Sequence, residues 1–171
     1  MRHLWTALLA LATTCAAFDA GAATYVTWQG EAVITAATPQ CSAAASEHHR
    51  IGVGTVVKSV LRPRLLADNG NDSRVSFIHD AQSMFALDLA GGLTLPGTGT
   101  YVAYGVTGYD GTTTNPPIKA NVGGQYQAFA LNPPTPAATV AFVTLRGTVS
   151  NFMFINGCRV TFRASYTRRP D

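Results

Sequence analysis

The chain has 171 residues, a formal charge of +3 and only 12% charged residues. Its length suits one domain with a hydrophobic core, and its small positive charge falls short of the clustered basic patch of nucleic-acid-binding proteins. Nucleic acid is therefore not an expected partner, and the abundance of Gly, Thr, Ala and Pro favours strands and loops over helices.

The first residues have the pattern of an export signal. A basic residue precedes a mainly apolar stretch from Leu4 to Ala12, and Ala20-Gly21-Ala22 matches the small-residue pattern that signal peptidases cut. We expect residues 1–22 to be a signal peptide, cleaved near Ala22/Ala23, and residues 23–171 to form a single domain. No later stretch approaches the roughly 18 apolar residues of a membrane helix. The predicted location is secreted or periplasmic, with association to the cell surface also open.

Two cysteines remain after this cleavage. Cys15 leaves with the signal, which leaves Cys41 and Cys158 as an even pair in a compartment where disulfides persist. We expect them to form a disulfide that joins the segment after the first strand to the last strand. A loop of this length gives a stabilisation of about 4 to 5 kcal/mol as an upper figure. A lipid anchor at Cys15 is less favoured, because the residues before it fit the usual lipidation pattern poorly.

Alternation of apolar and polar residues predicts about eight strands. In chain order they are Thr24–Thr35, Ile51–Leu61, Val75–His79, Met84–Leu89, Thr100–Thr107, Tyr126–Leu131, Thr139–Val149 and Asn156–Thr167. The strongest turn signal is Asp68-Asn69-Gly70-Asn71-Asp72, and the longest irregular loop is predicted over Gly108–Gly124. The strand spacing predicts an all-β fold, an antiparallel two-sheet β-sandwich of the jelly-roll or Ig-like type with one disulfide.

The last predicted strand has the clearest division into two faces. Its apolar positions, which we expect in the core, are Cys158, Val160, Phe162, Ala164 and Tyr166. Its outward positions include two arginines, and two more arginines follow, so the candidate anion-binding residues are Arg159, Arg163, Arg168 and Arg169. The guanidinium group suits carboxylate, sulfate or phosphate groups. An alternative explanation of these arginines is that they form a solvated, charged edge that discourages pairing with the sheet of another molecule.

Catalytic and metal-binding signals are weak. His48, His49 and His79 do not have the paired spacing of structural zinc sites, so we expect no metal and no cofactor. Serines occur near His79 and Asp80, but the sequence contains no Gly-x-Ser-x-Gly nucleophile motif. No catalytic residue is predicted.

These observations favour a non-catalytic binding or envelope-structural role. The candidate partners are an anionic polysaccharide, an anionic lipid or another envelope protein. One alternative is a self-associating surface subunit, similar in general character to bacterial fimbrial proteins, which also combine a signal, one disulfide and alternating strands. In those subunits the two cysteines lie much closer together, so no residue role is carried over. A second alternative is a small secreted hydrolase.

Overall fold

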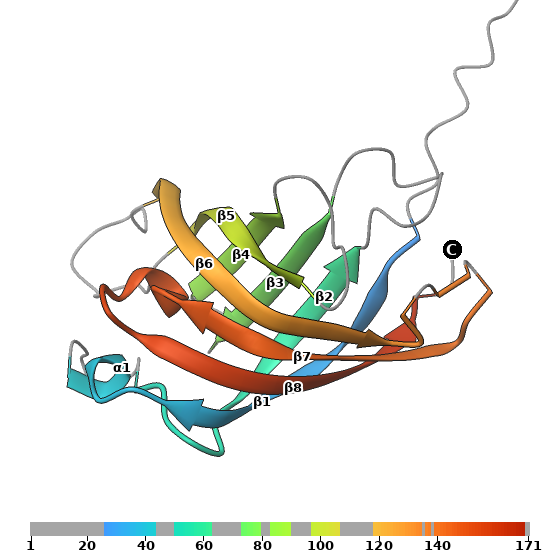
Figure 1. Cartoon of the computed structure of the whole chain (residues 1–171), viewed down its shortest axis with the longest axis horizontal. Helices are drawn as coiled ribbons and strands as arrows, with labels where there is room; N and C mark the ends of the chain where they lie inside the picture. The colour runs from blue at the N-terminus through green and yellow to red at the C-terminus, as the bar shows by residue number, and fades with distance from the viewer. Residues whose placement is uncertain are drawn as a thin grey trace, which may run out of the picture.

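The computed structural model describes residues 26–43, 50–62, 73–79, 83–89, 97–106, 118–134, 136–137 and 139–169. Eight antiparallel strands form a closed barrel in which neighbours in the sequence are neighbours in the sheet (Figure 1). They are β1 (Trp28–Ala37), β2 (Val56–Arg62), β3 (Arg74–His79), β4 (Ser83–Leu89), β5 (Gly97–Val106), β6 (Ile118–Asn132), β7 (Phe142–Ser150) and β8 (Arg159–Arg168). Two short helical segments are α1 (Gln40–Ala43) and η3 (Phe152–Phe154). The all-β prediction with eight antiparallel strands is confirmed.

The predicted two-sheet sandwich is wrong, because the sheet closes on itself. β1 pairs with β8 at nine positions, from Trp28 opposite Arg168 to Ala37 opposite Val160. A sandwich and a barrel both bury one face of every strand, so both produce the same two-residue alternation in the sequence. The alternation therefore predicts which residues are buried without distinguishing the two architectures.

The predicted starts of β6 and β2 differ most from the structure. β6 begins at Ile118 and pairs with β5 through the glycine-rich stretch, so the second part of the predicted 108–124 loop is strand. At Gly124 the absent side chain leaves room for the ring of Tyr101. The rest of that loop and the turn predicted at Asp68–Asp72 lie outside the described residues. Residues 51–55 precede β2 and include a turn at Gly54, whose φ is 88°.

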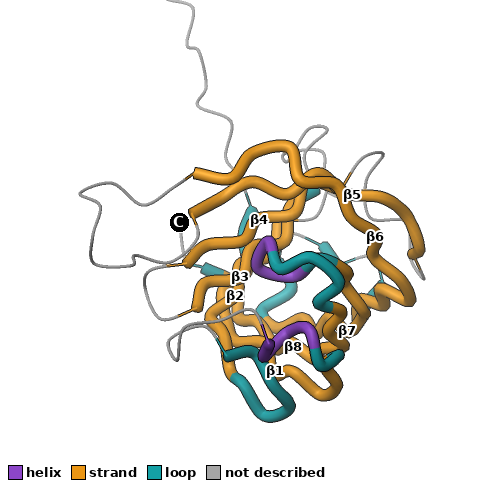
Figure 2. Tube along the Cα trace, turned by 90° about the vertical axis from the view of Figure 1, so that its left-hand side faces the viewer, coloured by secondary structure: helices purple, strands orange, loops and turns teal. Residues whose placement is uncertain are grey.

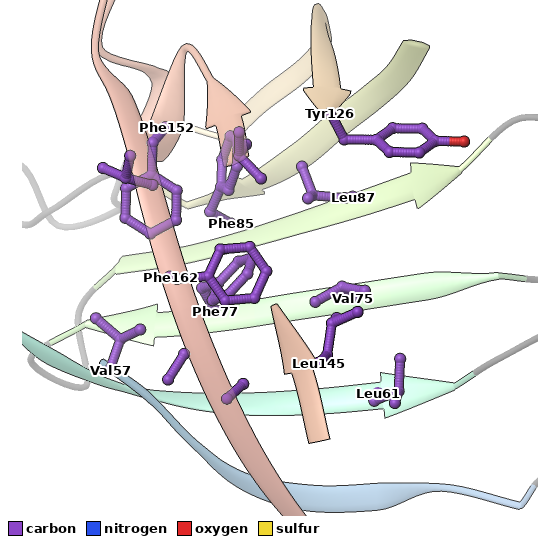
Figure 3. Packing of buried hydrophobic residues seen from close by; sticks show 14 of the residues in the cluster. Val57, Leu61, Val75, Phe77, Phe85, Leu87, Tyr126, Leu145, Phe152 and Phe162 are labelled. Carbon is purple, nitrogen blue, oxygen red and sulfur yellow. The ribbon is translucent and has the colours of Figure 1, made fainter. Parts of the chain in front are cut away.

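Aromatic rings fill the barrel interior (Figure 3). Phe77 makes edge-to-face contacts with Phe152 and Phe162, at ring-centroid distances of 5.2 and 5.0 Å. Phe85 contacts Phe152 at 5.4 Å. The inward residues predicted for the last strand are all buried, as are Val26, Trp28, Ala32 and Ile34 of the first strand region. The predicted inward faces of both strands are confirmed.

The disulfide between Cys41 and Cys158 is present and spans 117 positions of the sequence. Cys41 lies in α1, just after β1, and Cys158 directly precedes β8. The bond therefore joins the two strands that close the barrel. Figure 2 shows the barrel from one end, where helical residues lie inside the outline of the strands. Phe152 of η3 is fully buried there against Phe77 and Phe85.

Phe162→Ala should lower the free energy of unfolding by about 3 to 5 kcal/mol, the range for large-to-small changes in a core. The ring is fully buried and contacts both Phe77 and Phe129. Urea unfolding of the oxidised protein measures the effect. Val102→Ala, which truncates an exposed side chain of β5, is the control and should change stability by less than about 0.5 kcal/mol. An unchanged midpoint for Phe162→Ala would contradict the assignment of the core.

Stability should fall as the pH rises from about 10 to about 12, because two tyrosines ionise less readily in the folded chain. Burial raises the pKa of Tyr101 from 10.0 to about 12, although a side-chain hydrogen bond with Ser150 lowers it. Complete burial also raises the pKa of Tyr166. Unfolded tyrosines lose their protons first, so high pH favours the unfolded state. Urea unfolding across this range measures the loss, and Tyr101→Phe should show a smaller loss than wild type. An equal pH dependence in both proteins would contradict this origin.

Candidate functional site

Two adjoining hollows lie on the outer surface of the barrel, across β6, β7 and β8, and Thr35 of β1 borders one of them. One encloses about 370 Å³ and the other about 480 Å³, within the range of roughly 300 to 1,000 Å³ that is typical of ligand sites. Ala130, Arg146 and Arg163 line both hollows. We therefore treat the two as one groove and call it the β7 groove.

The centre of the β7 groove holds two arginines that face each other across neighbouring strands. Arg146 of β7 is the register partner of Arg163 of β8, and both side chains are exposed. The next pair on the same face is Thr148 and Thr161, whose hydroxyl oxygens lie 3.0 Å apart. Antiparallel pair types repeat every second residue, so the arginines occupy the same type of pair, with Cβ atoms about 4.5 to 5.5 Å apart. The two arginine side chains thus project from adjacent backbone positions on the outer surface of the barrel.

Neither arginine has a carboxylate partner within the described part of the chain. Glu31 of β1 is the acidic residue nearest to Arg163 in the register. Its partner on β8 is Ser165, two residues from Arg163 on the same face. It forms no ion pair with Arg146 or Arg163 among the described residues. Like charges directly opposite each other destabilise a sheet, whereas an opposite-charge pair in the same place would contribute about 0.2 to 1 kcal/mol. The pair is therefore an uncompensated positive site.

A bulge in β6 shapes the floor of the groove. Between Gln127 and Ala130 the register shifts, so that two residues of β6 lie opposite Gly147 alone. Ala128, at the bulge, has a φ of 52°, and Phe129 is buried with its ring in the space that a side chain at Gly147 would need. Only small groups remain on the outer side here. The bulge therefore leaves a shallow depression beside the long arginine side chains, and bulges often occur near binding sites.

The structure separates the four arginines that the sequence singles out. Arg163 lines the groove, whereas Arg159 lies on the same face four residues away, about 13 Å along the strand. Arg168 is half-buried opposite Trp28 at the other end of β8, and Arg169 follows the strand end. The anion-binding role of these four residues stays a prediction, and the geometry gives Arg163 a different companion from those expected.

The sequence alone does not single out this companion, Arg146. The alternation of Val143, Leu145 and Val149 already indicates that Arg146 points outward from its strand. What the sequence lacks is the register between β7 and β8, which alone places Arg146 opposite Arg163. The sequence therefore indicates the face of β7 on which Arg146 lies, but not the residue of β8 that lies opposite it.

The other candidate residues do not form a recognisable site in the described part of the chain. His79 is a buried residue at one end of β3, where Ser83 of β4 is its register partner. Ser76 lies within β3, and Ser73 lies just before its other end, roughly 20 Å from His79 along the strand. The described residues contain no group of three or more His, Cys, Asp or Glu side chains that would hold a metal ion. His48, His49 and Asp80 lie outside the described residues.

Within the residues that the structure places, no helix is both long and apolar enough to cross a membrane. Comparison of the chain with protein-family profiles, with curated proteins and with solved structures gives no match. The description of the site therefore rests on its own geometry.

Removing either central arginine should leave stability unchanged or raise it. Arg146→Gln or Arg163→Gln relieves the like-charge contact, and we expect a gain of about 0.2 to 1 kcal/mol at low salt. The gain should shrink as salt rises, because salt screens exposed charges. Thermal unfolding at two salt concentrations measures it, with Arg159→Gln as the control that removes the same charge from a distant outward position of β8. A loss above about 1 kcal/mol in both central variants would show a structural role for these side chains.

Proposed function

We propose that this is an exported, non-catalytic binding protein whose β7 groove recognises a carboxylate, sulfate or phosphate group of an envelope or extracellular component. The observation that carries the proposal is the opposed pair Arg146 and Arg163, exposed in a hollow and without a carboxylate partner among the described residues. Each guanidinium offers a planar set of donors that matches an anionic group with two oxygens. An anion between them would also remove their mutual repulsion.

Export is supported by two independent features. The N-terminal segment has the charge, apolar stretch and small-residue site of a signal peptide. The disulfide between Cys41 and Cys158 is of a kind that persists outside the reducing cytoplasm. A binding partner would then be met in the same compartment.

Binding without catalysis agrees with the composition of the groove. Its charged lining residues are Arg146 and Arg163, whose guanidinium groups are hydrogen-bond donors without an acceptor. Its remaining side chains offer no general acid or base.

Self-assembly by strand exchange is less favoured by the topology. Each of the eight described strands is paired on both sides, because β1 also pairs with β8. Addition of a donated strand requires an unpaired edge. The closed barrel offers none among the described strands.

The direct test is titration of the mature, oxidised protein with glucuronate, sulfate and phosphate, followed by nuclear magnetic resonance. We expect shifts that concentrate on β6, β7 and β8. The double variant Arg146→Gln/Arg163→Gln should weaken binding at least about tenfold, since a hydrogen bond to a charged group contributes about 1.5 to 3 kcal/mol. Higher salt should weaken binding by the wild type.

The matched control is Arg159→Gln/Arg169→Gln, which removes two exposed charges from β8 and its end while sparing the groove. It should retain most of the affinity. Equal losses of affinity in both double variants would mean that anions bind by general charge attraction, and would overturn the β7 groove as the binding site. Failure of the wild type to bind any of the three anions at low salt would overturn the proposed function.

A further inference from the structure

We propose that the ligand of the β7 groove is an oligosaccharide with one acidic sugar, whose acidic group lies at Arg146 and Arg163 and whose neutral sugars extend toward Phe142. This inference rests on the proposed function and names the class of molecule that carries the anion. It follows from the order of side chains along the outer face of β7 and its two neighbours.

The row next to the arginines is neutral and has free hydrogen-bonding capacity. Asn132 of β6 pairs in register with Thr144 of β7, which pairs with Ser165 of β8. These three side chains line the first hollow, and none of them has a hydrogen-bond partner within the described part of the chain. An amide and two hydroxyls in a row offer both donors and acceptors, which is the chemistry that sugar hydroxyls require.

The row on the other side of the arginines is different. Thr148 and Thr161 bond to each other, and the Thr35 hydroxyl donates to the Thr161 carbonyl at 3.2 Å. Their hydrogen-bonding capacity is thus partly used within the protein. A ligand held by the arginines therefore finds more open polar partners on the side of Thr144, which gives the proposed ligand a direction.

An exposed aromatic ring lies at the end of this path. Phe142 is 52% exposed and is the next residue after Thr144 on the same face of β7. From Arg146 to Phe142 the distance along the strand is about 13 Å, which exceeds the size of any single carboxylate or phosphate group. An exposed ring beyond a row of neutral polar groups suits stacking against the apolar face of a sugar.

The charges around the groove favour a ligand with one acidic group over one with many. Glu31 is the register neighbour of Ser165 and extends the neutral row with a carboxylate. A second acidic sugar in that row would approach this negative charge. Nucleic acids and uniformly acidic polysaccharides place a charge on every unit and fit this arrangement less well.

A lipid is the main competing ligand. Val33 is the register partner of Arg163 and pairs with Val56 of β2, and both valines are exposed, by 40% and 52%. These valines extend the arginine row in the direction away from β6, and like Phe142 they lie outside the two hollows. Among these described strands, no row of open neutral polar groups lies between the arginines and the valines, because Val33 is directly opposite Arg163. The open polar row and Phe142 therefore favour the sugar, and a lipid becomes an outcome of the test.

The test compares defined probes by isothermal titration calorimetry with the mature, oxidised protein. The probes are glucuronate, a glucuronate-substituted xylotriose, neutral xylotetraose, trigalacturonate, and vesicles of phosphatidylcholine with phosphatidic acid. We expect the substituted xylotriose to bind at least tenfold more tightly than glucuronate and more tightly than trigalacturonate. Xylotetraose should bind far more weakly than either acidic probe.

Phe142→Ala should lower affinity for the substituted xylotriose toward that of glucuronate, while leaving glucuronate binding unchanged. Phe142→Tyr keeps the ring and should retain wild-type affinity, and Val102→Ala controls for loss of an exposed apolar side chain elsewhere. Arg146→Gln/Arg163→Gln should weaken binding of both acidic probes. Circular dichroism confirms folding of each variant.

Equal affinity for glucuronate and the substituted xylotriose, or equal affinity of Phe142→Ala and wild type for the latter, would overturn the oligosaccharide. Tighter binding to the phosphatidic acid vesicles, lost in Val33→Asn, would replace it with a lipid. In these cases arginine-dependent binding of glucuronate would still support the proposed function. Absence of any arginine-dependent binding would overturn both.

Discussion

The pairing of β1 with β8 is the constraint on which the rest of the structure depends. It joins residues more than a hundred positions apart at nine places and turns an open meander into a barrel without a free edge among the described strands. The disulfide reinforces the same closure from the end of β1 to the start of β8. Closure also completes one row across the outside, where Val33, Arg163, Arg146 and Ala130 lie side by side on four strands. The interior and the outer groove are thus consequences of one set of backbone contacts.

The core and the groove are coupled at the bulge of β6. Phe129 turns inward, contacts Phe162 at a ring-centroid distance of 5.6 Å and occupies the space left by Gly147. The outer surface is left with small groups at the same place, so a well-packed interior and a hollow exterior have a common cause. Because the site is built on strands rather than on loops, its arginines start from fixed backbone positions, which reduces the ordering that binding must impose.

The sequence predicts which face of a strand each side chain occupies better than it predicts which residues of two strands lie opposite each other. In β8 the alternation from Cys158 to Tyr166 identified the buried side chains, because each strand of a sheet with one buried face repeats every two residues. Parity and compartment similarly identified the disulfide. Neither argument contains the register of one strand against another, so Arg146 was not linked to Arg163, and neither reveals that β1 meets β8. The glycines, prolines and threonines of Gly108–Gly124 predict a loop, but its second part is the start of β6, where Gly124 makes room for Tyr101.

The arginine pair connects stability with binding. Two like charges held opposite each other raise the free energy of the empty protein, whereas the unfolded chain lets them separate. An anion placed between them removes that repulsion only in the folded state, so its binding must stabilise the fold. A sheet that tolerated the pair for structural reasons would instead be expected to supply a carboxylate on a neighbouring strand, as Asp88 does for Arg74 at 2.9 Å. The barrel supplies such a partner to Arg74 and withholds it from Arg146 and Arg163 among the described residues, and this contrast within one sheet is the physical reason to place the proposed ligand there.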